Sequence, residues 1–215
     1  WGALFAGVYA HSGQINDLEW RALQIKETEV PSKALLSARV KAEPISILNP
    51  SLNSTFASSI LEKSKISYAC PSLSLRQNRV QILARGSTRD AMAKCLPYPP
   101  FFTDTSGQIA APFAVDEAIG FLKSKGVQLI VFVNVLSQGE LFPGRAATEY
   151  YSENVLWNEA KRQLSKEKLT GIHMIISVNT GDKSLLDFDQ RRSLIDAGAT
   201  SARDSVNKLV SEYGY

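Results

Sequence analysis

The second half of the chain contains two units in which a helical pattern is followed, after a glycine, by a short apolar run. The first unit joins a helix over Asp116 to Lys125 to a strand over Val127 to Val133. The second joins a helix over Asn154 to Lys166 to a strand over Ile172 to Val178. Runs rich in Val and Ile are typical of strands buried on both faces, as in parallel sheets covered by helices. The sequence therefore predicts an α/β fold with a central, mostly parallel sheet.

The two ends of the chain carry helical patterns. Trp1 to His11 is predicted to be a buried helix whose small residues allow close approach of neighbouring backbone. These small residues are Gly2, Ala3, Ala6, Gly7 and Ala10. The closing segment, Phe188 to Tyr213, is predicted to be a helix interrupted near Gly198. Its expected inward-facing residues are Leu194, Ile195, Val206, Leu209 and Val210.

Local signals organise the segments between these elements. Asn16, with Glu19 three residues later, is similar to a capping box and predicts the start of a second helix. Apolar runs at Ile66 to Cys70 and Val80 to Leu83, with turn-forming residues between them, predict a hairpin. Ser87, with Asp90 three residues later, opens a short helix over Ala91 to Cys95, which must end before Pro97 because proline lacks a backbone donor.

Composition excludes several classes of protein. The 215 residues suffice for one globular domain, and the 24 basic and 21 acidic residues are scattered without a block of like charge. Nucleic acid is therefore not an expected partner. The chain has no apolar run of membrane-spanning length, so a soluble domain is expected, while the compartment is not indicated.

The cysteines and histidines do not predict a metal site. Cys70 and Cys95 have no CxxC partner, so neither a zinc site nor a disulfide framework is indicated, and we expect buried free thiols. His11, near a helix end, and His173, at the start of an apolar strand, are expected to have structural roles. Neither lies in a metal-binding motif, and no metal or cofactor is expected.

Three stretches, in the same order along the chain, resemble the bacterial patatin-like phospholipase family. The first, Trp1 to Ala10, is similar to the helix that follows the nucleophile in the motif G-x-S-x-G. Trp1 and Gly2 match the last two positions of that nucleophile elbow, so the serine is expected immediately before Trp1. The second stretch, Arg85 to Pro97, continues to Phe101 and Phe102 and resembles the segment that leads into the loop of the catalytic aspartate.

The third stretch, Ser106 to Ala118, resembles the family's D-G-G/A segment, its proline-containing turn and the following helix. In this alignment Ser106 stands where the family has its aspartate, and Gly107 and Gln108 follow in the active-site loop. Asp104 is the nearest carboxylate, and two interpretations of it stay open. A local shift of the loop would make Asp104 the catalytic base, whereas the commoner use of such an aspartate is an Asx-turn with its own backbone.

The resemblance implies a three-layer patatin-like domain over residues 1–215, lacking its N-terminal strands, its glycine-rich oxyanion loop and its nucleophile. It implies a serine-dependent lipid acyl hydrolase when complete, with a lipid or acyl ester as substrate. Association with its own N-terminal segment and peripheral contact with a membrane are further expectations. Three aromatic residues, Phe101, Phe102 and Phe113, would line an acyl cleft, although core packing explains them equally well.

Two other classes of protein remain open. The serine at position 106 favours a catalytically silent relative that binds lipid or a partner through the same cleft. An unrelated α/β binding domain is the other alternative, because fold resemblance alone does not establish function.

Overall fold

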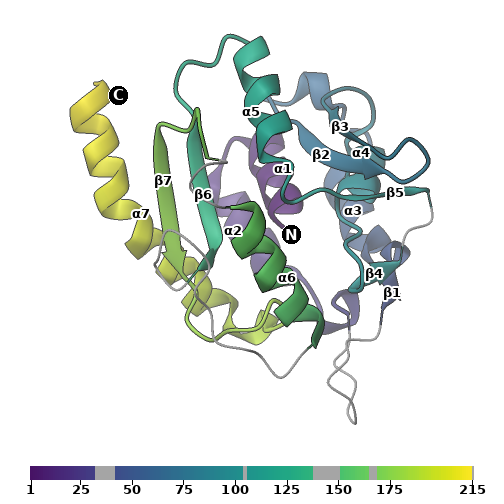
Figure 1. The fold of residues 1–215 in the computed structure, drawn as a ribbon. Helices are drawn as coiled ribbons and strands as arrows, with labels where there is room; N and C mark the ends of the chain where they lie inside the picture. Colours follow the sequence, from purple (N-terminus) through teal and green to yellow (C-terminus); the bar gives the residue numbers. More distant parts are fainter. Residues whose placement is uncertain (32–41, 104–105, 138–150, 165–168, 215) are drawn as a thin grey trace. The chain divides into compact units, whose positions relative to one another are not determined.

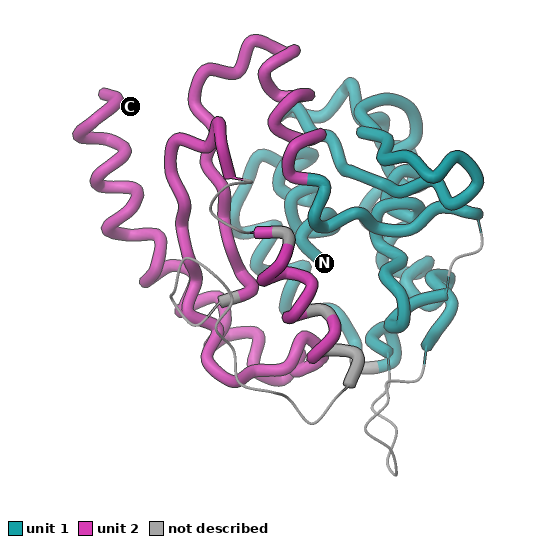
Figure 2. The backbone as a smooth tube through the Cα atoms, in the orientation of Figure 1, with its two compact units in different colours: residues 1–114 teal, residues 115–215 magenta. Residues whose placement is uncertain are grey.

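The computed structural model describes residues 1–31, 42–103, 106–137, 151–164 and 169–214 (Figure 1). Helices and strands are mixed in it, as an α/β chain requires. The chain divides into two compact units, Trp1–Ala114 and Val115–Tyr215 (Figure 2). We describe each unit by itself. The expectation of a single domain is not tested by this division.

The described residues of the first unit form the α-helices α1 (Gly2–Ser12), α2 (Ile15–Gln24), α3 (Asn49–Phe56) and α4 (Thr88–Cys95). The predicted N-terminal helix is confirmed, and it ends because Gly13 adopts a left-handed conformation with φ of 67°. The predicted cap of α4 is also confirmed, since the Ser87 hydroxyl accepts a hydrogen bond from the Asp90 N–H at 3.3 Å. The capping box at Asn16 was wrong. The predicted second helix is present as α2, but its N-cap is Gln14, two residues before Asn16, and it has no side-chain cap.

Helix α1 packs into the core of the first unit through Leu4, Gly7 and Val8. A Cβ atom at Gly7 would collide with the terminal methyl of Met92 and would lie 3.5 Å from Phe56. Close approach at this glycine is therefore as expected. The buried face differs from the predicted one, because Gly2 and Ala6 are exposed while Leu4 and Val8 are buried. Gly7 and Ala10 are buried as predicted, and Leu4 and Val8 are buried with them.

Two small sheets complete the first unit. Strands β2 (Cys70–Ser74) and β3 (Arg79–Leu83) form the expected antiparallel hairpin, with Cys70 opposite Leu83 and Ser74 opposite Arg79. The first strand begins four residues later than predicted. Strand β5 (Gln108–Ala110) pairs with the other edge of β2, which gives the order β3-β2-β5. Separately, β1 (Glu43–Pro44) pairs in parallel with β4 (Phe102–Thr103).

A disulfide joins Cys70 and Cys95, and this corrects the expectation of free thiols. The bond links the first residue of β2 to the last residue of α4. Both cysteines are buried in a cluster with Leu61 and Ala91, against which Tyr68 and Leu83 also pack. The sequence did not indicate this bond because the cysteines lie 25 positions apart and meet only when α4 packs on the sheet.

The second unit contains α5 (Val115–Ser124), β6 (Val131–Ser137), α6 (Tyr151–Gln163), β7 (Met174–Asn179) and α7 (Arg191–Tyr213). Strands β6 and β7 pair in parallel, with Val131 opposite Met174 and Val133 opposite Ile176, so the predicted parallel pairing is confirmed. Figure 1 shows α7 running alongside β7. Ile176 and Val178 of β7 are buried, as are Trp157 and Ala160 of α6.

Two predictions for the second unit need correction. Strand β6 begins four residues later than predicted. The helix before it ends in a turn at Gly126, which has φ of 77°, and residues 127–130 lie outside regular secondary structure. Helix α7 continues without interruption through Gly198, where a glycine is tolerated within a long helix. Val206 and Val210, predicted to face inward, are each 46% exposed, whereas Leu194, Ile195 and Leu209 are half-buried.

Candidate functional site

The start of α1 lies against the beginning of the predicted active-site loop. The ring of Trp1 packs edge-on against Phe102, with 5.9 Å between ring centroids and an angle of 74° between the planes. The Phe5 N–H donates to the Trp1 carbonyl at 3.2 Å, so regular helix begins directly after Trp1. Gly2 is exposed and has open space where a Cβ atom would project. Trp1 is half-buried and its backbone amino group is enclosed, so of the two expected elbow positions only Gly2 is exposed, and the helix starts next to β4.

The aromatic residues of the proposed acyl cleft are mostly packed inside the first unit. Phe101 and Phe102 are each 6% exposed. Tyr98 stacks on Phe101 with 6.3 Å between ring centroids, and the Phe101 N–H donates to the Tyr98 carbonyl at 2.9 Å. Phe113 is half-buried. Burial of this kind fits the core-packing interpretation, and lining of an acyl cleft stays a prediction.

The two candidate positions for the catalytic base differ in what the structure describes. Asp104 lies outside the described residues. Ser106 is described and is exposed. Gly107 follows with φ of 72°, a left-handed conformation that favours glycine, and its carbonyl accepts a hydrogen bond from the Leu75 N–H at 2.9 Å. Through this hydrogen bond Gly107, the residue after Ser106, is held against the turn that joins β2 and β3.

Gln108 is held by a buried serine that the sequence did not single out. The Ser72 hydroxyl of β2 is fully buried and lies 3.1 Å from Gln108 Oε1. The same hydroxyl lies 2.9 Å from the Lys94 carbonyl and 3.2 Å from the Ile109 carbonyl. The single hydroxyl proton donates to one of these three oxygens at a time, and the Lys94 carbonyl is the nearest. Ser72 thus lies where helix α4, strand β2 and strand β5 meet. Gln108 serves this junction, which is a structural role for a residue expected in the active-site loop.

Tyr68 is a second residue that sequence reasoning missed. Its hydroxyl donates a hydrogen bond to the Ala3 carbonyl, in the first turn of α1, at 2.9 Å. Burial raises the pKa of the Tyr68 phenol well above its usual value, because the charged phenolate would lose its hydration. The hydroxyl therefore stays protonated and keeps its donor. The only signal in the sequence was an aromatic residue within an apolar run, which does not indicate a hydrogen-bond partner 65 positions away.

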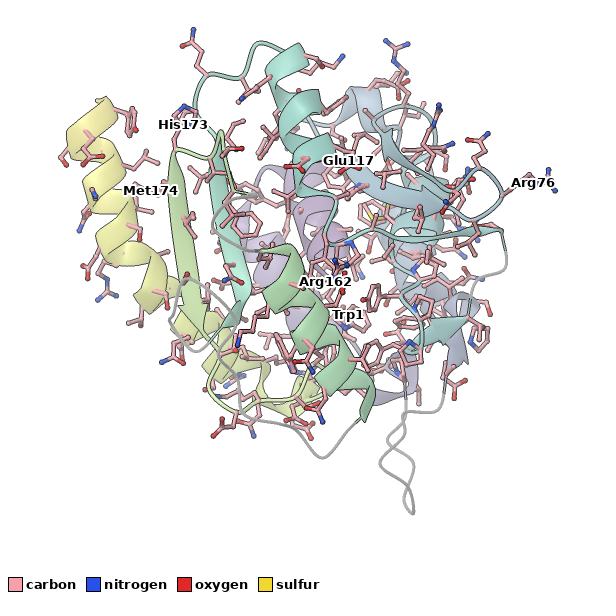
Figure 3. The ribbon with its side chains drawn as sticks, in the orientation of Figure 1. Trp1, Arg76, Glu117, Arg162, His173 and Met174 are labelled. Carbon is pink, nitrogen blue, oxygen red and sulfur yellow. A yellow bond between two sulfur atoms is a disulfide. The ribbon has the colours of Figure 1, made fainter. Side chains whose placement is uncertain are left out.

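Each histidine has a hydrogen-bond partner within its own unit, which fits the structural roles expected of both. His11 Nε2 lies 3.2 Å from the Ser59 hydroxyl, in the first unit. His173, directly before β7 (Figure 3), accepts a hydrogen bond from the Ile130 N–H through Nδ1 at 3.1 Å. In the part of the chain that the structure describes, no group of three or more His, Cys, Asp or Glu residues is placed to hold a metal ion. Within the same residues, no helix is long and apolar enough to cross a membrane.

Comparison with known proteins adds no support to the resemblance, which depends on the residues of this chain alone. No model of a known protein family matches the chain, and a search of curated proteins finds no significant match.

Proposed function

We propose that this chain is part of a patatin-like, serine-dependent lipid acyl hydrolase. Its nucleophile would be a serine immediately before Trp1, at the elbow that leads into α1. The substrate would be a phospholipid, a lysophospholipid or a neutral ester. In the complete protein the two units would belong to one three-layer α/β domain with helices on both faces of a mostly parallel sheet.

The contact between Trp1 and Phe102 is the observation that carries this proposal. Residues 101 positions apart meet there, and they belong to the first and second stretches that resemble the family. A serine one residue before Trp1 would stand at the N-terminus of α1, where the positive end of the helix dipole stabilises negative charge. A developing oxyanion needs such stabilisation, and each well-aligned donor contributes roughly 3 kcal/mol in the transition state.

The chemistry also needs a base that accepts the proton of the serine hydroxyl as it attacks the ester carbonyl. In this proposal Asp104 supplies the carboxylate, two residues before the position where the family has its aspartate. The hydroxyl of Ser106 has no comparable basicity and would not replace it. No cofactor or metal enters this mechanism.

A catalytically silent relative is the second candidate function. The specific observation in its favour is Ser106, which stands exposed at the family's aspartate position. Such a protein would keep the arrangement of α1 and the loop and would bind a lipid or a partner without hydrolysing it.

The proposed partners follow from the resemblance. They are a lipid or acyl ester substrate, the polypeptide segment N-terminal to Trp1, and the surface of a membrane touched from one side. The segment would carry the elbow serine and the glycine-rich loop.

Hydrolysis of a short acyl ester by the full-length polypeptide tests the proposal. Asp104→Asn is expected to lower kcat by a factor of at least about 100, the usual contribution of a general base. Asp116→Asn, which removes an exposed carboxylate at the start of α5, is the matched control and should leave kcat unchanged. Unchanged turnover in Asp104→Asn would eliminate Asp104 as the base.

The companion variant is Ser106→Asp. Activity that appears in this variant, from an inactive parent, would identify a silent relative with an otherwise intact site. If the parent and both variants lack activity, and the residue before Trp1 is not serine, the proposed hydrolase is wrong.

A further inference from the structure

Strand β3 is an edge strand of the antiparallel sheet in the first unit. The order β3-β2-β5 leaves it paired on one side only among the described residues. The Leu75 N–H donates to the carbonyl that directly precedes β5, and successive residues of a strand alternate sides, so the backbone of Ser74 faces β3. Its partner Arg79 therefore faces β2. The N–H and C=O groups of Val80 and Ile82, which alternate with it, face outward.

The middle of β3 is suited to accept a further strand. Natural edge strands often prevent pairing with a charge or a proline inside the strand. The four residues that follow Arg79 in β3 read VQIL and contain neither. Val80 and Ile82 are half-buried, so each keeps accessible apolar surface next to its outward backbone groups. Branched side chains beside open donors and acceptors favour the addition of an extended peptide.

Exposed arginines lie around this strand. Arg76 projects from the turn of the hairpin (Figure 3), Arg79 is the first residue of β3, and Arg85 follows two residues after its end. None of the three forms a salt bridge with an acidic residue in the part of the chain that the structure describes. Glu62 lies near Arg85, where its carboxylate accepts a hydrogen bond from the Gly86 N–H at 2.8 Å. One carboxylate beside three guanidinium groups leaves the edge positively charged.

The positions of these charges disfavour pairing between two copies of the chain. In an antiparallel pair centred on Gln81, Arg79 of each copy would approach Arg85 of the other. Like charges at neighbouring positions across a pair of strands destabilise the pairing. Carboxylates at the same positions would have the opposite effect, so the charge of the edge selects an acidic partner.

We propose that the outward edge of β3 binds an extended, acidic peptide segment of another protein as an added strand. Its backbone would pair with the N–H and C=O groups of Val80 and Ile82. Its middle would be uncharged and β-branched, and each end would carry carboxylates that reach Arg79 or Arg85. About seven extended residues, at roughly 3.3 Å each, span the chain between these two arginines. The inference does not depend on the proposed hydrolase.

Binding of a synthetic peptide to the full-length polypeptide tests the proposal. The probe carries a fluorophore and has two glutamates at each end, with alternating valine and threonine between them. Its Kd, measured by fluorescence anisotropy, is expected to rise several-fold as the salt concentration increases from about 0.05 M to about 0.5 M. The matched peptide with lysines in place of the glutamates should bind at least about tenfold more weakly. Equal affinity for the two peptides, or no binding of the acidic one, would overturn the proposal.

Variants of the chain locate the bound peptide. Arg79→Glu should raise the Kd of the acidic peptide about fivefold or more, whereas Arg192→Glu, at an exposed position of α7 in the second unit, should not change it. Val80→Pro removes an outward N–H group, which a free edge strand tolerates, and Val80→Thr keeps that group. The proline variant should bind at least about tenfold more weakly than the threonine variant.

Two further measurements complete the test. Circular dichroism establishes that each variant is folded, and the Arg79→Glu comparison still decides the proposal if Val80→Pro does not fold. Unchanged affinity in Arg79→Glu would place the peptide elsewhere and overturn the proposal. Sedimentation of the polypeptide alone should show no dimer that Val80→Pro dissociates, since such a dimer would identify a second copy as the occupant and also overturn it. Ester hydrolysis is measured separately and decides the proposed function independently.

Discussion

The disulfide between Cys70 and Cys95 makes a quantitative prediction about the stability of the first unit. A covalent bond between residues 25 positions apart restricts the unfolded chain. For a closed loop of that length, the chain-entropy relation gives about 3.5 kcal/mol of stabilisation. Both half-cystines are buried in an apolar cluster, so the replacement residue must be apolar as well. The double variant Cys70→Ala/Cys95→Ala is therefore the appropriate change.

We expect this variant to lower the free energy of unfolding of the first unit by about 3 to 4 kcal/mol. Chemical denaturation followed by tryptophan fluorescence measures the change. Trp1 and Trp20 report on the first unit and Trp157 reports on the second. Separate transitions for the two units would be fitted separately, because a single two-state value does not describe them.

A reductant provides the matched control. It should shift the unfolding transition of the wild-type protein toward that of the double variant, and it should leave the double variant itself unchanged. Alkylation under non-reducing conditions should modify neither cysteine in the native wild-type protein. Two freely alkylated thiols, or a loss of stability below about 1 kcal/mol in the double variant, would refute the reasoning.

Three further predictions concern helices and a buried phenol. Gly7→Leu should lower the free energy of unfolding by about 2 kcal/mol, because the new side chain would overpack the core. Gly2→Leu changes an exposed position of the same helix and should not lower it. Denaturant titration of the two variants measures the difference. Tyr68→Phe should cost about 1 kcal/mol through loss of the hydrogen bond to Ala3. Burial raises the pKa of Tyr68 in the folded protein. The stabilisation by the neutral phenol is therefore complete below the unfolded-state pKa of about 10, and it declines as the pH rises above that value. Above a pH of about 10 the wild-type protein should lose stability more steeply than Tyr68→Phe. Gly198→Ala should stabilise the protein by about 1 kcal/mol, since α7 is unbroken and a Cβ atom there meets no neighbour; a destabilised variant in thermal melts would contradict a continuous helix.

Local signals in the sequence determined several elements of this protein. The hydroxyl of Ser87 caps α4 because a serine at that position satisfies a backbone donor within three residues. The apolar runs that form β6 and β7 predicted a parallel pair because strands separated by a helix cannot return as a tight hairpin. The hairpin of β2 and β3 was predictable for the opposite reason, since a short polar turn joins its strands. Each of these predictions depends on residues that are close in sequence.

Only part of the candidate site could be predicted from the sequence. The resemblance predicted that Trp1 and the segment around Phe102 belong to one site. Their rings are in contact, and their membership of a functional site stays a prediction. The roles of Gln108 and Tyr68 were not predictable. Their partners, Ser72 and Ala3, lie 36 and 65 positions away, and hydrogen bonds of that range leave no periodic pattern in the sequence.

The helices and strands that the sequence predicted lie within about four residues of their observed bounds, because backbone propensity, capping and apolar periodicity act locally. The short strands β1, β4 and β5 were not predicted, since they form by pairing with distant segments. Tertiary structure decided which of their residues are buried and which are joined. Leu4 and Val8 are buried together with the expected Gly7 and Ala10, whereas Gly2 and Ala6 are exposed. Cys70 and Cys95 became a disulfide because α4 packs on β2. These outcomes depend on the packing of elements that are distant along the chain, and the local sequence does not indicate which distant elements pack together.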